Sequence, residues 1–253
     1  MREDPSSVRH GALPRSDHLS HPRWVLLHGM RPLLRAYSLR RFGVTVHRAE
    51  LVPTAGPVIL AANHLGWVDG PLLALFSLRR VHVLTKAEMF VGGMDLFLRA
   101  AGAIPVDRYA ADPRAMKKAL RVLRDDGGVG IFPEGARGAG ELDLIQRGAA
   151  YLALATGAPV VPAIFFGSRE PGADSHERPS RASPVDLVFG ETWQLPARPW
   201  PRRKPDVGAA TEALREHLLR ALYEAKTITG RELPGPLPAG DSERDAAARQ
   251  ATT

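Results

Sequence analysis

The residues best suited to chemistry are a histidine and an aspartate that follow a short apolar run. The segment Val58-Ile-Leu-Ala-Ala-Asn-His-Leu-Gly-Trp-Val-Asp69 is typical of a buried strand that ends at Asn63 and His64, with a turn at Gly66 before Asp69. Such a turn can bring the carboxylate to the imidazole, which fixes the tautomer and leaves the other ring nitrogen as a base near neutral pH. Taken alone, such a pair is more often structural or a metal ligand than catalytic.

Two further segments end in polar residues suited to an anion. Gly102-Ala-Ile-Pro-Val-Asp-Arg108 delivers an arginine, and Val129-Gly-Ile-Phe-Pro-Glu-Gly-Ala-Arg137 runs into a glycine-rich turn with a carboxylate and a second arginine. The planar guanidinium suits a phosphate, and two arginines can hold one dianion. One arginine could be an ordinary surface charge, but three successive strand ends with polar residues indicate a common site.

The elements that must position these residues alternate along the chain. β-type runs are predicted at 43–47, 58–62, 81–84, 103–106, 129–132, 160–166 and 185–189. Helices are predicted at 71–77, 89–101, 113–124, 142–155 and 206–227. This alternation predicts an α/β fold with a mostly parallel, mixed sheet and helices on both faces. In such sheets ligands bind at the carboxyl ends of the strands.

The ends of the chain differ in composition from this domain, which we place at residues 43–229. Residues 1–20 are polar and rich in Ser, His, Arg and Pro, and the 230–253 tail mixes Pro, Gly, Ala and Arg, so disorder is expected in both.

Residues 21–42 predict an amphipathic helical segment before the domain. Leu26, Met30, Leu33 and Tyr37 fall on one stripe, with Arg31 and Arg35 across from them, and Pro32 could split the segment into two short helices. One interpretation is a helix packed on the domain. The other is an interfacial helix on a membrane, with its arginines at headgroup level.

Composition narrows the partners. The net charge of +7, from 34 basic against 27 acidic residues, favours anions such as phospholipid headgroups, phosphorylated substrates or nucleic acid. Nucleic acid fits poorly because the basic residues are scattered and no aromatic-basic motif is present. The absence of cysteine excludes disulfides and a cysteine nucleophile. No zinc-type histidine pair suggests a metal, and neither a secretory signal nor a spanning helix is expected.

Taken in order, these segments resemble the four sequence blocks of the 1-acylglycerol-3-phosphate acyltransferase family (the bacterial PlsC type). The blocks are His64-x4-Asp69, residues 102–108, residues 132–137 and Val161-Pro162. Lys86-Ala-Glu-Met-Phe90 is similar to the family's lysine-containing segment between the first two blocks, and the resemblance covers residues 40–225. The family usually has Glu-Gly-Thr-Arg where this chain has Ala136, so a hydroxyl contact is missing and acceptor preference could differ.

The resemblance implies a role for each matching residue. His64 would take the proton from an acceptor hydroxyl that attacks a thioester carbonyl directly, with Asp69 orienting the imidazole. Lys86 could contact the acceptor phosphate, the carrier's phosphates or the developing oxyanion. The residues expected to hold the glycerol phosphate are Arg108, Glu134, Gly135 and Arg137. Supporting positions are Asn63, Gly66, Pro133 and Pro162.

The resemblance also implies a reaction and its partners. A fatty acyl group would pass from acyl-CoA or acyl-carrier protein to a lysophospholipid, foremost 1-acyl-sn-glycerol-3-phosphate to give phosphatidate, without cofactor or metal. The enzyme would sit peripherally on an anionic membrane surface at its cytoplasmic face. Three alternatives stay open: a relative that acylates another lysolipid, a glycolipid or an aminolipid; a metal-dependent phosphoesterase using His64, Asp69 and Glu134; and a non-catalytic basic membrane-binding module.

Overall fold

One seven-stranded sheet organises the protein. The computed structural model describes residues 22, 25–181, 183–198, 201–241 and 243. The strand order is β1-β7-β6-β2-β5-β3-β4, with the five strands from β6 to β4 mutually parallel. β7 runs antiparallel to β6, and β1 pairs parallel with β7. The predicted mixed, mostly parallel α/β sheet is thus confirmed. The strands are β1 Thr45–His47, β2 Val58–Ala62, β3 Val81–Lys86, β4 Ile104–Val106, β5 Gly128–Ile131, β6 Val160–Phe166 and β7 Asp186–Phe189.

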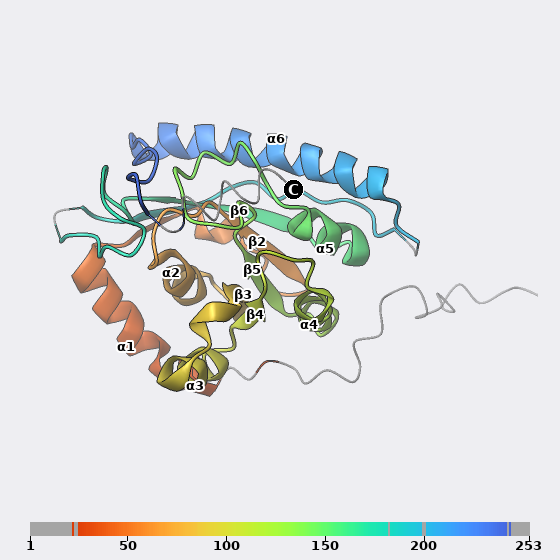
Figure 1. The fold of residues 1–253 in the computed structure, drawn as a ribbon, viewed down its shortest axis with the longest axis horizontal. Helices are drawn as coiled ribbons and strands as arrows, with labels where there is room; N and C mark the ends of the chain where they lie inside the picture. Colours follow the sequence, from red (N-terminus) through yellow and green to blue (C-terminus); the bar gives the residue numbers. More distant parts are fainter. Residues whose placement is uncertain (1–21, 23–24, 182, 199–200, 242, 244–253) are drawn as a thin grey trace, which may run out of the picture.

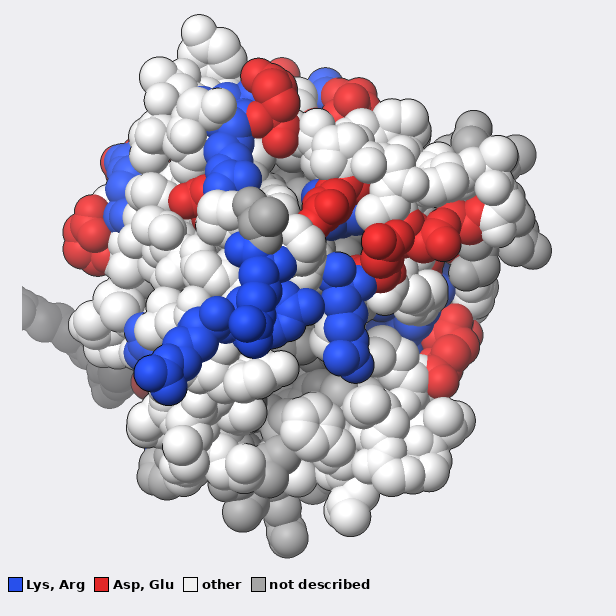
Figure 2. Space-filling model, turned by 90° about the vertical axis from the view of Figure 1, so that its left-hand side faces the viewer, with Lys and Arg blue, Asp and Glu red and all other residues white. Residues whose placement is uncertain are grey.

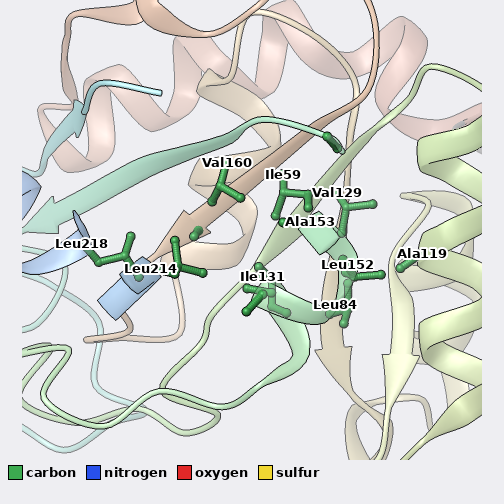
Figure 3. Packing of buried hydrophobic residues seen from close by; sticks show 14 of the residues in the cluster. Ile59, Leu84, Ala119, Val129, Ile131, Leu152, Ala153, Val160, Leu214 and Leu218 are labelled. Atoms are coloured by element: carbon green, nitrogen blue, oxygen red, sulfur yellow. The ribbon is translucent and has the colours of Figure 1, made fainter. Parts of the chain in front are cut away.

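Helices cover both faces of this sheet (Figure 1). They are α1 Val25–Phe42, α2 Asp69–Phe76, α3 Gly92–Ala100, α4 Pro113–Arg124, α5 Gly148–Thr156 and α6 Lys204–Thr229, with 3-10 turns at Ala49–Leu51 and Ala87–Met89. Two apolar cores result. Ile59 and Ala61 of β2 pack with α4, α5 and α6 (Figure 3), whereas Val58 and Leu60 pack with α2. Because successive side chains of a strand point to opposite faces, a strand buried on both faces reads as a continuous apolar run.

Two predicted helices are shorter than expected. The prediction at 89–101 is interrupted because Gly92 has φ of +53°, which a continuous right-handed helix does not allow, so a 3-10 turn precedes α3. The prediction at 142–155 starts too early because the Leu142 N–H donates to Glu134 and the Gln146 N–H donates to the Pro133 carbonyl. The residues before α5 therefore serve the loop after β5.

α1 is continuous through Pro32, so the predicted division into two helices is wrong. The guanidinium of Arg31 donates to the Leu75 carbonyl (3.1 Å) and to that of Ser77, at the end of α2. Arg35 lies over the Phe76 ring. These contacts pack both arginines, which stay partly exposed, against the domain, and a cation at a helix carboxyl end is stabilising. Residues 1–20 lie outside the described residues.

The tail beyond Gly230 is only in part what the sequence predicted. Its residues 231–241 and 243, here called the C-terminal segment, return to the body of the protein. Leu233 packs against both cores and Leu237 is buried. Glu243 is 3% exposed. The prediction of disorder is wrong for this stretch, because two leucines and two buried carboxylates give it contacts that its Pro/Gly composition did not indicate.

Candidate active site

The candidate residues lie at the carboxyl ends of four neighbouring parallel strands. β2, β5, β3 and β4 are consecutive in the sheet, so their carboxyl ends meet at one edge. Lys86 is the last residue of β3. His64, Glu134 and Arg108 follow β2, β5 and β4 by two or three positions. This edge is the position at which open α/β sheets bind ligands.

His64 and Asp69 are in hydrogen-bonding contact. Nδ1 of His64 lies 2.9 Å from Oδ2 of Asp69. The same Oδ2 accepts hydrogen bonds from the backbone N–H groups of Leu65 (2.7 Å) and Gly66 (2.9 Å). Asp69 is fully buried in the first turn of α2. Three donors converging on one oxygen fix the carboxylate, so the imidazole is oriented and its Nε2 is left for a substrate.

The surroundings of His64 favour a neutral imidazole. Its ring stacks on Phe132 with centroids 4.1 Å apart. Burial lowers the pKa of His64 below its ordinary value, although the bond to Asp69 acts in the opposite direction, and the charge of Arg137 lowers it further. A base must be unprotonated to accept a proton, so this shift suits general base catalysis at neutral pH.

Glu134 holds the backbone of the site. Its Oε2 accepts a hydrogen bond from the His64 N–H (2.8 Å), and its Oε1 accepts one from the Leu142 N–H (3.3 Å). Burial raises the pKa of Glu134 to about 7, against the effect of these two bonds. The sequence predicted contact with the glycerol phosphate; the carboxylate is instead engaged by two backbone groups, which makes Glu134 a positioning residue for His64.

Arg137 lines an open pocket near His64 and Asp69. The pocket has a volume of about 270 Å³ and is lined by Trp67, Lys86, Met89, Arg137, His176 and Arg178. The guanidinium of Arg137, 5% exposed, donates to the Ser175 carbonyl (3.3 Å) and to Nδ1 of His176 (3.2 Å). Burial lowers the pKa of Arg137, and the nearby charges of Glu243 and Asp69 raise it. The arginine therefore lies close to His64 and Asp69, at the wall of a pocket with several cations.

Lys86 and Arg108 share one carboxylate. Nζ of Lys86 lies 2.5 Å from one oxygen of Glu243, and a terminal nitrogen of Arg108 lies 2.7 Å from the other. Burial alone would raise the pKa of Glu243, but these bonds lower it to about 2. Glu88, half exposed, lies 3.7 Å from Arg108. The predicted anion-binding cations are thus brought together, and a residue of this chain contacts two of them.

The supporting residues have clear local reasons. The side chain of Asn63 both donates to the Phe165 carbonyl (3.1 Å) and accepts from the Phe165 N–H (2.7 Å), which ties the end of β2 to β6. A side chain at Gly66 would collide with the Ser168 carbonyl. Gly135 has φ of +76°, a conformation that favours glycine. All three positions shape the loops around His64.

The two prolines fit this arrangement. The Pro133 carbonyl accepts from the Gln146 N–H (2.6 Å), which closes the loop between β5 and α5. Pro162 lies within β6, where a proline usually disrupts a central strand. β7 ends at Phe189, paired with the residue after Pro162, and the Pro162 carbonyl still accepts from Gly190. The missing N–H therefore interrupts no hydrogen bond between these strands.

Sequence reasoning missed several contributors. Residues 168–184 gave only the pattern of a polar loop, but they supply His176 and Arg178 to the pocket, and Arg178 lies over the Trp67 ring. Glu243 lay in the segment predicted to be disordered. The aromatic partner Phe132 is the first residue of a recognised block, and its place immediately after β5 was the signal that could have identified its role.

The described part of the chain contains no group of three His, Asp or Glu side chains that could hold a metal ion. Oδ2 of Asp69 and both oxygens of Glu134 are directed to N–H groups. This geometry argues against the phosphoesterase alternative, which requires these carboxylates around an ion.

Comparison with known proteins decides the family. The Acyltransferase family profile matches residues 43–165. The 1-acyl-sn-glycerol-3-phosphate acyltransferase of Bacillus subtilis is 31% identical over 180 residues, which cover 70% of this chain and 87% of that protein. The chain belongs to the 1-acyl-sn-glycerol-3-phosphate acyltransferase family. It is an acyltransferase, and the resemblance drawn from the ordered blocks is confirmed.

Further family members and a solved structure agree. The enzyme of the same name from Borreliella burgdorferi is 28% identical over 130 residues, covering 49% of this chain and 52% of that protein. The human β isoform is 28% identical over 116 residues, covering 44% and 42%. The crystal structure of PlsC from Thermotoga maritima has the same fold, with a TM-score of 0.58, 22% identity, and coverage of 79% of this acyltransferase and 80% of that chain. In the present acyltransferase, no helix among the described residues is long and apolar enough to cross a membrane.

Proposed function

We propose that this acyltransferase moves a fatty acyl group from acyl-CoA or acyl-carrier protein to the free hydroxyl of a lysophospholipid, foremost 1-acyl-sn-glycerol-3-phosphate, which gives phosphatidate. The observation that carries the proposal is the His64–Asp69 pair at the sheet edge, beside a pocket lined by Lys86 and Arg137. The names of the relatives in Bacillus subtilis and Borreliella burgdorferi support the choice of acceptor.

The proposed step is direct transfer. Nε2 of His64 takes the proton of the acceptor hydroxyl as its oxygen forms a bond to the thioester carbonyl carbon. The C–S bond then breaks, and the leaving thiolate takes the proton from the imidazolium, which returns His64 to its neutral form. Asp69 is buried beside Nδ1, so its carboxylate would stabilise the imidazolium that forms. The side chain of His64 is 17% exposed and that of Asp69 is fully buried, and shielding from water strengthens the attraction between the imidazolium and the carboxylate.

The cations would bind the acceptor's phosphate. Lys86 and Arg137 line the pocket, and Arg108 contacts the same carboxylate as Lys86. Two guanidinium groups and an ammonium group supply three positive charges, which attract the roughly two negative charges of a phosphate monoester. Because they lie at the same sheet edge as His64, a bound glycerol phosphate would present its hydroxyl to the imidazole.

The proposed approach to a membrane uses the exposed apolar side chains of two helices. Met30, Leu33 and Tyr37 of α1 are exposed, as are Leu96 and Phe97 of α3. Leu33 and Leu96 are 71% and 74% exposed. A band of Lys and Arg side chains crosses the face of the molecule that carries α1 (Figure 2). Apolar side chains beside cations suit an anionic lipid surface, which we take to be the cytoplasmic face.

The test is an acceptor panel on anionic vesicles. Purified enzyme is given acyl-CoA or acyl-carrier protein with lysophosphatidate, other lysophospholipids, a glycolipid and an aminolipid, and thiol release is followed with identification of the acylated product. We expect rapid release with lysophosphatidate only. Faster acylation of another acceptor would replace the proposed substrate. If no acceptor supports thiol release from either carrier, the proposal is contradicted.

A further inference from the structure

The C-terminal segment brings a carboxylate into the group of cations that would bind phosphate. The two oxygens of Glu243 contact Lys86 and Arg108 at 2.5 and 2.7 Å. The side chains of these three residues are 3%, 18% and 12% exposed. Charge-assisted bonds at such short distances, shielded from water, are among the stronger polar contacts of a protein. The segment therefore occupies two of the three cations that we propose to hold the acceptor.

The carboxylate is held in place by a neighbouring anchor. Asp241 accepts hydrogen bonds from the N–H (2.8 Å) and hydroxyl (3.0 Å) of Ser175 and from the N–H of Glu243 (2.8 Å). The guanidinium of Arg169 donates to the Gly235 carbonyl. The anchor acts on the loop that also supplies His176 to the pocket. Glu243 is thus positioned by a short chain of contacts, separate from the apolar packing of Leu237.

This arrangement conflicts with phosphate binding. Lys86 still lines the open pocket, but Arg108 does not, and its guanidinium contacts Glu243 and Glu88. A phosphate monoester carries more charge than one carboxylate and offers three acceptor oxygens, so it can compete for the same cations. Both anions could not share the pair without strong repulsion.

Resting on the proposed function, we propose that the C-terminal segment is autoinhibitory: Glu243 occupies the Lys86–Arg108 pair in the free enzyme, and the phosphate of the acceptor displaces it. The apparent affinity for the acceptor is then reduced by the fraction of enzyme in which the pair is occupied. Displacement frees the segment from Ser175 and opens the wall of the pocket.

The test compares Glu243→Gln with a matched control. Glu232→Gln makes the same change in the same segment, but Glu232 is highly exposed and pairs with Lys226 outside the site. Binding of glycerol 3-phosphate is measured by calorimetry, the KM for lysophosphatidate by thiol release, and folding by thermal unfolding. We expect Glu243→Gln, and a chain that ends at Gly240 and keeps Leu237, to bind both ligands about 10-fold tighter. Glu232→Gln should match the wild type.

A measurement on the unaltered protein covers the case in which a variant does not fold. Glycerol 3-phosphate should speed hydrogen exchange of the backbone N–H groups of Ser175, Gly235 and Leu237 and of residues 239–241. Slower or unchanged exchange with the ligand bound, or folded Glu243→Gln with equal or weaker binding, overturns autoinhibition. Because these readouts need no turnover, tighter binding without any acylation would refute only the proposed reaction, and acylation with unchanged binding would refute only the role of Glu243.

Discussion

Asp69→Asn separates the charge of the proposed catalytic aspartate from its geometry. Three donors converge on Oδ2: the His64 ring and the N–H groups of Leu65 and Gly66. Oδ1 has no hydrogen-bond partner among the described residues. An asparagine can therefore place its carbonyl oxygen at the Oδ2 position and its amide NH2 at the Oδ1 position. The opposite orientation would face an NH2 group with three donors, so the imidazole tautomer should be kept.

The magnitude follows from which bonds change. A hydrogen bond to a charged group contributes roughly 1.5–3 kcal/mol and a neutral one roughly 0.5–1.5 kcal/mol. Losing the charge beside the developing imidazolium should therefore cost about 1–2 kcal/mol, or roughly 5–30-fold in kcat. Asp69→Ala is different, because it leaves two buried N–H groups without an acceptor at about 1–3 kcal/mol each. That variant should lose several degrees of Tm, whereas Asp69→Asn should lose few.

The assay is steady-state thiol release with saturating lysophosphatidate, together with thermal unfolding of both variants. A loss on the order of 10⁴-fold in folded Asp69→Asn, the size expected for a wrong imidazole tautomer, would show that the amide faces His64 and that the reasoning is wrong. An unchanged kcat would show that the carboxylate charge makes no contribution to the reaction.

Three further predictions concern the surroundings of this pair. Arg137→Lys should raise the KM for lysophosphatidate about 10-fold with little effect on kcat, because an ammonium group cannot reproduce the guanidinium fork; a fall in kcat at unchanged KM would contradict a role in acceptor binding. Since burial lowers the pKa of His64, kcat/KM should fall only as pH drops below about 6.5, when the imidazole becomes protonated. Glu134→Gln is the control that removes the titration of Glu134 near pH 7, and an acid limb centred above 7 in that variant would refute the assignment. Asn63→Ala should lower the free energy of unfolding by roughly 2–5 kcal/mol in urea denaturation, because it leaves the buried N–H and carbonyl of Phe165 unpaired; a loss below about 0.5 kcal/mol would show that these groups find other partners.

The strands and the catalytic pair could be predicted because their signals are local. Val58–Ala62 and Val160–Phe166 are continuous apolar runs, and both have the predicted bounds. Pro113–Arg124 also begins where predicted, since Asp112 caps it by accepting from the Ala115 N–H (2.9 Å). The turn between His64 and Asp69 needs only the residues within it.

The remainder depends on contacts between distant segments, which a single sequence does not display. One partner of Arg108, the carboxylate of Glu243, lies 135 positions further along the chain. The stripe of Met30, Leu33 and Tyr37 left two interpretations open because its exposure depends on how Arg31 anchors α1 to α2. The backbone role of Glu134 could not be read from its block either, since a carboxylate before a glycine suits a ligand equally well.

The central claim is that His64 removes the proton from a hydroxyl held at this site, and one comparison tests it most directly. Wild type and His64→Ala are each titrated with lysophosphatidate by calorimetry and then assayed in a single turnover with acyl-CoA, with phosphatidate measured by mass spectrometry. We predict that binding stays within about threefold while the transfer rate falls by at least about 10²-fold, the usual contribution of a general base. Transfer by folded His64→Ala at the wild-type rate would contradict the account.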